Sequence, residues 1–175
     1  YDQDQTMPET EESRLKNVDA ARPYEASKIE MERALGEFAA QDIIIVRPFN
    51  HIGPGQELGF IVPDLASGIS EALASGNTKV SVGNLASRRD YTDVRDVVSA
   101  YISLLELEHP AHRVYNICSG TSRSGQEIFD ALAREFGAES LIPETDQTRL
   151  RGASDNSTIV GSFDRLHQET GWQPT

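Results

Sequence analysis

A short run of branched apolar residues constrains the fold of this chain most strongly. Asp42-Ile43-Ile44-Ile45-Val46 is a predicted strand, and it follows a predicted helix over 27–40 in which apolar residues recur at helical spacing. A strand that is apolar at successive positions is typical of a parallel sheet covered by helices on both faces. The run therefore predicts an α/β fold with a buried strand that stops at Arg47-Pro48.

Two polar residues follow this strand in the segment Phe49-Asn50-His51-Ile52-Gly53-Pro54-Gly55-Gln56. Open α/β sheets bind ligands in the loops that leave the carboxyl ends of their strands. Asn50 and His51 are therefore candidate ligand-binding residues. The alternatives are an Asx-turn at Asn50 and an exposed loop histidine at His51. No second His, Cys or carboxylate stands at ligand spacing beside His51, so no metal site is predicted.

Tyr24 and Lys28 are four residues apart, and on a helix such residues share one face. The phenol could exchange a proton with a substrate, and the lysine charge would make its oxygen easier to ionise. In this composition a Tyr-x3-Lys match arises by chance roughly one time in ten. On spacing alone, a surface tyrosine beside a solvated lysine is an equally good interpretation.

With the helix, the buried strand and the segment RPFNHIGPGQ, the chain resembles the extended short-chain dehydrogenase/reductases. Within them it is most similar to the GDP-4-keto-6-deoxy-mannose reductases, which are relatives of the GDP-mannose 4,6-dehydratases. Further matching stretches are VGNL (82–85), RDYTDVRDVV (89–98), YNICSG (115–120) and TGWQP (170–174). The resemblance implies the C-terminal part of a Rossmann-type parallel sheet plus a small α/β substrate-binding domain. It assigns 1–56 to the end of the Rossmann-type domain, and 57–175 mainly to the substrate domain with interleaved returning Rossmann elements.

The resemblance also implies a set of catalytic and cofactor-binding residues. Tyr24 would be the general acid, and Lys28 its electrostatic partner and a ligand of the cofactor ribose. Pro48 and His51 would also lie at the cofactor, which would be NADP or NAD.

Arg89 is implied as a ligand of the substrate diphosphate, and Asn50 as a contact of the nucleotide-sugar. The planar donor fork of a guanidinium suits two phosphate oxygens. The alternative for Arg89 is a surface ion pair with Asp90 or Asp93, which would be worth little. Its neighbour Arg88 would point elsewhere on a strand and receives no role.

Two further substrate contacts are implied at Lys79 and Arg151. The stretch from Lys79 to Leu85 is expected to set the preference for GDP. Arg151 resembles an arginine of the family that also binds the diphosphate. Here Gly152 replaces the proline that follows it in the family, so Arg149 is a rival.

The implied reaction is reduction of the C4 ketone of a GDP-6-deoxy-hexulose to a GDP-6-deoxyhexose of the GDP-rhamnose type. A nucleotide-sugar 4-epimerase or 4,6-dehydratase on the same scaffold is an alternative. A non-catalytic fragment that binds a sugar nucleotide or a partner is another. The chain has no glycine-rich pyrophosphate turn, and the family's catalytic Ser or Thr would precede Tyr1. We therefore expect the C-terminal half of a longer enzyme, inactive by itself.

Composition bears on partners and compartment. The net charge of −12, from 28 acidic and 16 basic residues, argues against nucleic acid and anionic membranes as partners. The single cysteine, Cys118, excludes an internal disulfide and fits a reducing, cytoplasmic location; a packed thiol is expected there. The resemblance adds a homodimer formed through the Tyr-x3-Lys helix.

The remaining pattern predicts the other elements. We expect a surface loop over 1–20 and a capping box at Ser124 to Glu127. Helices are predicted over 59–75, 93–107, 124–137 and 163–169, and strands over 79–83, 114–117 and 159–160. The helix over 93–107 has an apolar stripe made of Val94, Val97, Val98, Tyr101, Leu104 and Leu105.

Overall fold

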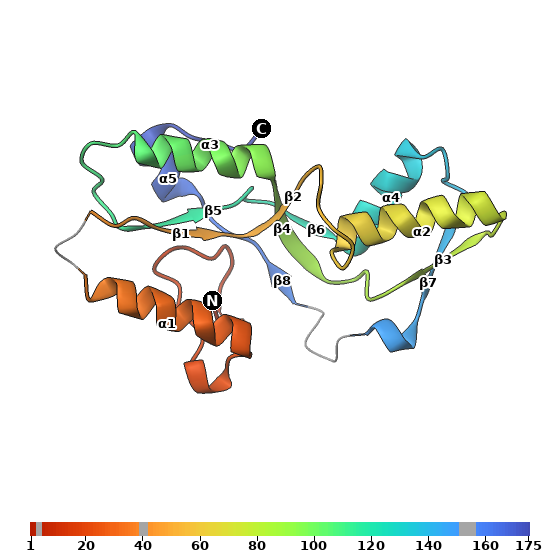
Figure 1. Ribbon diagram of the computed structural model, residues 1–175, viewed down its shortest axis with the longest axis horizontal. Coiled ribbons are helices and arrows are strands. Elements are labelled where there is room, and N and C mark those ends of the chain that lie inside the picture. The colour runs from red at the N-terminus through yellow and green to blue at the C-terminus, as the bar shows by residue number, and fades with distance from the viewer. Residues whose placement is uncertain (3–4, 39–41, 151–156) are drawn as a thin grey trace. The chain divides into compact units, whose positions relative to one another are not determined.

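Helices and strands alternate along the chain in the computed structural model, which describes residues 1–2, 5–38, 42–150 and 157–175 (Figure 1). The helices are α1 (Pro23–Gly36), α2 (Ile61–Ser75), α3 (Val94–Leu105), α4 (Gly125–Glu135) and α5 (Asp164–Thr170), with short 3-10 turns η1 (Val18–Ala20) and η2 (Gln147–Arg149). The strands are β1 (Ile45–Pro48), β2 (Asn50–Ile52), β3 (Lys79–Val82), β4 (Arg88–Asp93), β5 (Val114–Ile117), β6 (Ser122–Ser124), β7 (Ile142–Thr145) and β8 (Thr158–Ile159). Within the described ranges, no helix is long and apolar enough to span a membrane.

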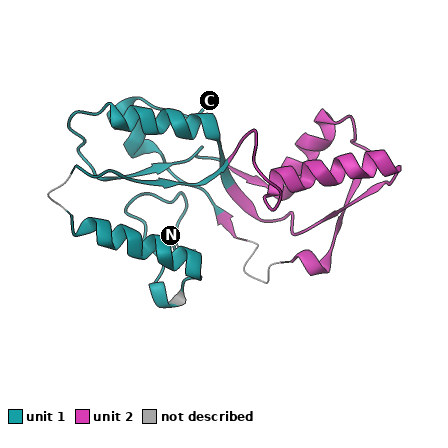
Figure 2. Cartoon of the chain, viewed as in Figure 1, with its two compact units in different colours: residues 1–51, 90–121, 159–175 teal, residues 52–89, 122–158 magenta. Residues whose placement is uncertain are grey.

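The chain forms two units, each assembled from separated segments (Figure 2). Unit 1 contains residues 1–51, 90–121 and 159–175, and unit 2 contains residues 52–89 and 122–158. Strands β2, β4 and β6 form one sheet in that order, with β8 paired to β4. The predicted division into 1–56 and 57–175 stays a prediction.

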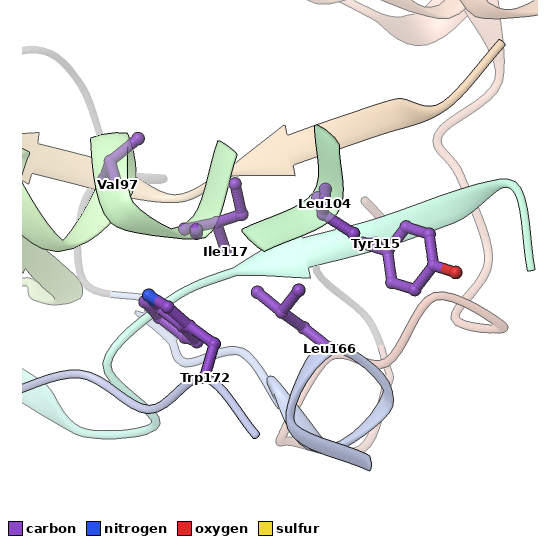
Figure 3. Packing of buried hydrophobic residues seen from close by; sticks show 7 residues of the cluster. Val97, Leu104, Tyr115, Ile117, Leu166 and Trp172 are labelled. Atoms are coloured by element: carbon purple, nitrogen blue, oxygen red, sulfur yellow. The ribbon is translucent and has the colours of Figure 1, made fainter. Parts of the chain in front are cut away.

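Unit 1 is built on the parallel pair of β1 and β5, in which Ile45 lies opposite Val114 and Pro48 opposite Ile117. Its core draws on α3, β5 and the C-terminal segment, as Figure 3 shows. The members are Val97, Ala100, Leu104, Tyr115, Ile117, Leu166 and Trp172. The Trp172 indole N–H donates to the Ser99 hydroxyl at 2.9 Å, so this buried ring also has its polar group satisfied.

Unit 2 is built on a second parallel pair, β3 with β7, in which Lys79 lies opposite Ile142. Strand β3 alternates as predicted: Val80 and Val82 are buried, whereas Lys79 and Ser81 are exposed. Helix α2 packs closely on this strand, because a Cβ at Gly68 would lie 2.9 Å from Val80 Cγ1. The predicted capping box opens α4. The two parallel pairs confirm the α/β prediction.

The predicted strand over 42–46 was wrong in its position. Strand β1 covers 45–48, so Arg47 and Pro48 lie inside it rather than ending it. The Ile45 N–H donates to the Arg113 carbonyl, one residue before β5, at 2.7 Å, and the Phe49 N–H donates to the Ile117 carbonyl at 2.9 Å. Position 48 alternates with these and needs no donor on that side, so it accepts proline. The strand is also half-buried in this chain rather than fully buried.

The N-terminal segment is not simply a surface loop. Glu9 is 1 % exposed, and its backbone pairs with the segment beyond β8. The Glu9 N–H donates to the Val160 carbonyl, and its own carbonyl accepts from Ser162, both at 2.8 Å. Sequence patterns missed this contact because the paired segments are about 150 residues apart.

Only part of the predicted stripe on α3 is buried. Val97 and Leu104 face the core, while Val98, Tyr101 and Leu105 are exposed. Ala100, which the prediction left out, is fully buried.

Candidate active site

Tyr24 and Lys28 lie in the first two turns of α1. The residues around Pro23 explain why the helix begins there. Pro23 occupies the first helical position, where its missing N–H costs nothing. The Glu25 carboxylate accepts the Arg22 N–H at 3.0 Å and pairs with Lys16 at 3.3 Å. Hydrogen bonding to the Arg22 N–H outweighs partial burial and lowers the pKa of Glu25. A charged carboxylate here also favours the helix N-terminus.

The Lys28 ammonium lies over the face of the Tyr24 ring, with Nζ 5.3 Å from the ring centroid. The Tyr24 side chain is 73 % exposed and Lys28 is also exposed, so both can meet a ligand. The helix predicted over 27–40 was placed too late in the chain: α1 covers Pro23–Gly36, so it contains both Tyr24 and Lys28 and brings them together on one face.

Pro48, Asn50 and His51 belong to the same unit as this pair. Asn50 and His51 begin strand β2, one residue after β1, and both side chains are exposed. The His51 ring contacts the Phe49 carbonyl through Nδ1 at 3.2 Å. The histidine is therefore oriented by its own strand end, with its Nε2 edge pointing away from that contact.

Lys79 and Arg89 belong to unit 2, and both have protein partners. Lys79 forms an exposed ion pair with Glu144 on the neighbouring strand, at 2.5 Å. Arg89 donates through Nη1 to the Arg88 carbonyl at 2.8 Å and to the Ser157 carbonyl. Arg88, to which no role was given, pairs with Glu127 at 2.9 Å.

Arg151 lies outside the described residues, so its role stays a prediction. Its rival Arg149 donates to the Ser81 carbonyl at 3.0 Å. Arg149, Ser81 and Lys79 line a shallow pocket of about 600 Å³ between α2 and β3, within unit 2. Asp64 and Glu71 lie on its helical side.

Cys118 is fully buried, as predicted for a packed thiol, and burial raises the pKa of its thiol. The described residues hold no group of three His, Cys, Asp or Glu side chains arranged to bind a metal ion. One residue of unit 1 that the sequence reading treated only as a strand end, Arg47, contacts α1 through Glu32. In the sequence, the only indication of this contact was an arginine placed directly after an apolar run.

The parallel α/β framework and a helix that presents Tyr-x3-Lys define the class: a Rossmann-related protein of the extended short-chain dehydrogenase/reductase type. The particular family follows from a family model that matches residues 1–118. The chain belongs to the NAD dependent epimerase/dehydratase family.

Relatives of known name agree with this assignment. The chain is 36 % identical over 156 residues to a GDP-6-deoxy-D-mannose reductase of Pseudomonas aeruginosa, covering 87 % of this chain and 50 % of the relative. It is 31 % identical over 168 residues to a UDP-glucose 4-epimerase of Mycolicibacterium smegmatis, covering 90 % and 49 %. A structure of RMD from Pseudomonas aeruginosa complexed with NADPH matches with a TM-score of 0.76 at 34 % identity, over 89 % and 52 % of the two chains. The chain thus spans about half the length of these relatives.

Proposed function

We propose that the protein carrying this chain is a nicotinamide-dependent oxidoreductase that reduces the C4 ketone of a GDP-6-deoxy-hexulose to a GDP-6-deoxyhexose. The observation that carries the proposal is the Lys28 ammonium over the exposed Tyr24 ring. The 36 % identity to a GDP-6-deoxy-D-mannose reductase supports the choice of substrate.

Tyr24 supplies the proton in this reaction. A nicotinamide, when bound, would supply a hydride to the ketone carbon, so that negative charge would develop on the ketone oxygen. A phenol within hydrogen-bond reach of that oxygen donates its proton there, and the Lys28 charge stabilises the tyrosinate that remains. Exposure of both side chains leaves the hydroxyl and the ammonium accessible to substrate and cofactor.

The cofactor, NADP or NAD, would contact Lys28 through its ribose, and Pro48 and His51 at the strand end. The residues present fit such a group in one respect. The Lys28 ammonium has three donors and, among the described residues, makes no ion pair that would occupy them.

The nucleotide-sugar would be held by Asn50, by Arg89 and by Arg151 or Arg149. Arg89 already donates to two backbone carbonyls through Nη1, which orients its guanidinium. Lys79 is exposed and its pair with Glu144 is a surface one, worth ~0–1 kcal/mol, so an anionic ligand can replace that partner.

A 4-epimerase or 4,6-dehydratase is the second candidate. The identity of 31 % to a UDP-glucose 4-epimerase supports this second candidate. The two readings differ in stoichiometry, because a reductase consumes one reduced cofactor for each product, whereas an epimerase or dehydratase returns its cofactor to the starting state.

The proposal is tested with the whole protein and a GDP-4-keto-6-deoxy sugar, by following cofactor oxidation and product. Tyr24→Phe keeps the ring and removes the proton donor, so we expect kcat to fall ~10²–10⁴-fold with little change in substrate affinity. Tyr101→Phe, at an exposed tyrosine of α3, is the matched control and should react like the parent. Near-normal turnover by Tyr24→Phe would remove Tyr24 from the mechanism.

A further inference from the structure

Arg47 holds a carboxylate on the same helix as Tyr24 and Lys28. Its Nε donates to Glu32 Oε2 at 3.0 Å, and its Nη2 donates to Glu32 Oε1, so both oxygens of Glu32 are engaged. The two side chains are only 16 % and 20 % exposed. Such a two-point guanidinium–carboxylate contact is among the stronger ion pairs that proteins form.

Glu32 stands on the same helical face as the catalytic pair. Tyr24, Lys28 and Glu32 are spaced i, i+4 and i+8, so Lys28 has an aromatic neighbour one turn before it and an acidic one a turn after it. A lysine and a glutamate four apart on a helix can pair, and the order with the lysine first is the weaker of the two. Here Glu32 faces Arg47, and Lys28 lies over the Tyr24 ring instead.

Resting on the proposed function, we propose that Arg47 is a positioning residue that keeps Glu32 away from Lys28, so that the ammonium charge serves Tyr24 and the cofactor. The role is electrostatic and acts through another residue. Arg47 itself need not touch the substrate.

The surroundings of Arg47 explain why it keeps Glu32. Its Nη1 donates to the Tyr1 hydroxyl at 2.8 Å and to the Glu11 carbonyl at 3.1 Å, and its guanidinium lies 5.0 Å from the Tyr1 ring centroid. Burial raises the pKa of Tyr1 to about 12, despite the hydrogen bond from Arg47, so Tyr1 is a neutral partner near pH 7. Glu32 is therefore the carboxylate to which Arg47 is bound in this cluster.

Two other carboxylates of α1 are each paired with a basic residue. On α1, Glu25 is paired with Lys16 and Glu30 with Arg33. From β1, the charged group that faces α1 is Arg47. If Arg47 is lost, Glu32 is thus the carboxylate on this face whose charge becomes available to Lys28.

Arg47→Met tests the proposal in the whole protein. Glu32 should then pair with Lys28, which weakens the positive field at Tyr24 and raises its pKa. The alkaline limb of kcat/KM for ketone reduction should move upward by about half a pH unit, roughly threefold in proton concentration. The turnover should fall as well, because the tyrosinate left after proton transfer is less stabilised.

A second substitution, which removes the charge of Glu32, distinguishes an electrostatic effect of Arg47→Met from an effect of looser packing. The double variant Arg47→Met/Glu32→Gln has no carboxylate to offer Lys28, so its alkaline limb should return to the parent position. A shift that persists in the double variant would overturn the proposal. Arg33→Met removes an exposed arginine that pairs with Glu30 on the same helix, at 2.7 Å, and is the matched control. It should leave the limb in place.

A direct titration keeps this test independent of activity. The absorbance of tyrosinate in each protein, minus that of the same protein with Tyr24→Phe, reports the ionisation of Tyr24. Arg47→Met should raise that midpoint, and an unchanged midpoint would overturn the proposal. Should Arg47→Met not fold by circular dichroism, Arg47→Lys keeps a cation without the two-point contact, and must shift the midpoint in the same direction by less. A parent protein that shows the expected titration but reduces no GDP-keto-sugar would instead refute the proposed function.

Discussion

Gly161 shows how closely single residues are packed in unit 1. A Cβ at this position would lie 2.7 Å from both Cys118 Sγ and Phe49 Cζ, closer than real side chains approach. Its N–H also donates to the buried Asp90 carboxylate at 3.2 Å, and that carboxylate accepts from Ser119 as well. The Gly161 backbone, the Cys118 thiol and the half-buried Phe49 ring therefore meet with no room for a methyl group.

We expect Gly161→Ala to lower the free energy of unfolding by ~1–3 kcal/mol, because the ring or the thiol must move to admit the methyl group. The urea midpoint, followed by circular dichroism, measures this. Gly36→Ala is the matched control, since nothing lies within 4 Å of its Cβ position at the end of α1. It should be neutral or slightly stabilising. Equal effects of the two changes would contradict the tight packing at Gly161.

The contacts that could be predicted from the sequence join residues close together in the chain, whereas the contacts that were missed join distant residues. Tyr24 and Lys28 are joined by helical spacing alone, so the pair was visible in the sequence. The partners of Arg47 include Tyr1, which is 46 residues away, and Asn116 donates to the Glu9 carbonyl from 107 residues away. No local pattern specifies such pairs, because they follow from how strands and loops meet in the folded unit.

At the scale of elements, the start of α3 depends on one carboxylate. Asp93 accepts the Arg95 N–H at 2.8 Å as the N-cap, and its carboxylate also pairs with the Arg95 guanidinium at 2.6 Å. Hydrogen bonds from the Arg95 side chain and then its backbone lower the pKa of Asp93 to about 2. The charged form is therefore the one that stabilises the folded chain.

The stabilisation from Asp93 should be present above its unfolded pKa of about 4 and should be lost as the pH falls through about 2. Asp93→Asn keeps a capping oxygen and removes the charge, so it should cost up to about 1 kcal/mol at neutral pH. This difference from the parent should shrink toward pH 2. Urea midpoints at several pH values give the comparison, and a gap that does not depend on pH would contradict it. Asp130→Asn, on the exposed face of α4, is the control and should change the midpoint less.

Elements with a complete local signal were predicted well. Strand β5 has the predicted bounds, and α4 begins at the predicted capping box. The signal was weaker where burial depends on distant partners. Half the apolar stripe of α3 is exposed, and β1 is shifted toward Pro48, because neither edge pairing nor helix coverage is encoded locally.

At the scale of the whole molecule, we predict a homodimer formed through α1. Met31 is 50 % exposed and Phe38, just beyond the helix, is 52 % exposed, and they are seven residues apart along one stripe. Burying such side chains against a second copy would stabilise an isologous pair. The whole protein should sediment as a dimer at micromolar concentration, and Met31→Glu should shift it toward monomer. Leu58→Glu changes an apolar residue in unit 2 that is more exposed still, at 68 %, and it should leave the dimer intact. A monomeric parent would contradict this prediction.

The assembly of unit 1 from three separated segments has a consequence for how the protein is made. Residues 1–51 reach their partners Val160, Ser162, Leu166 and Trp172 only after all of unit 2 has been synthesised. Unit 2 can pair β3 with β7 once residues 142–145 have left the ribosome. Strand β1 can pair with β5 before β7 is made, but unit 1 closes last, because the C-terminal segment that completes its core is synthesised after unit 2. A chaperone that holds the growing chain would therefore meet the Tyr24 helix before the core behind it exists.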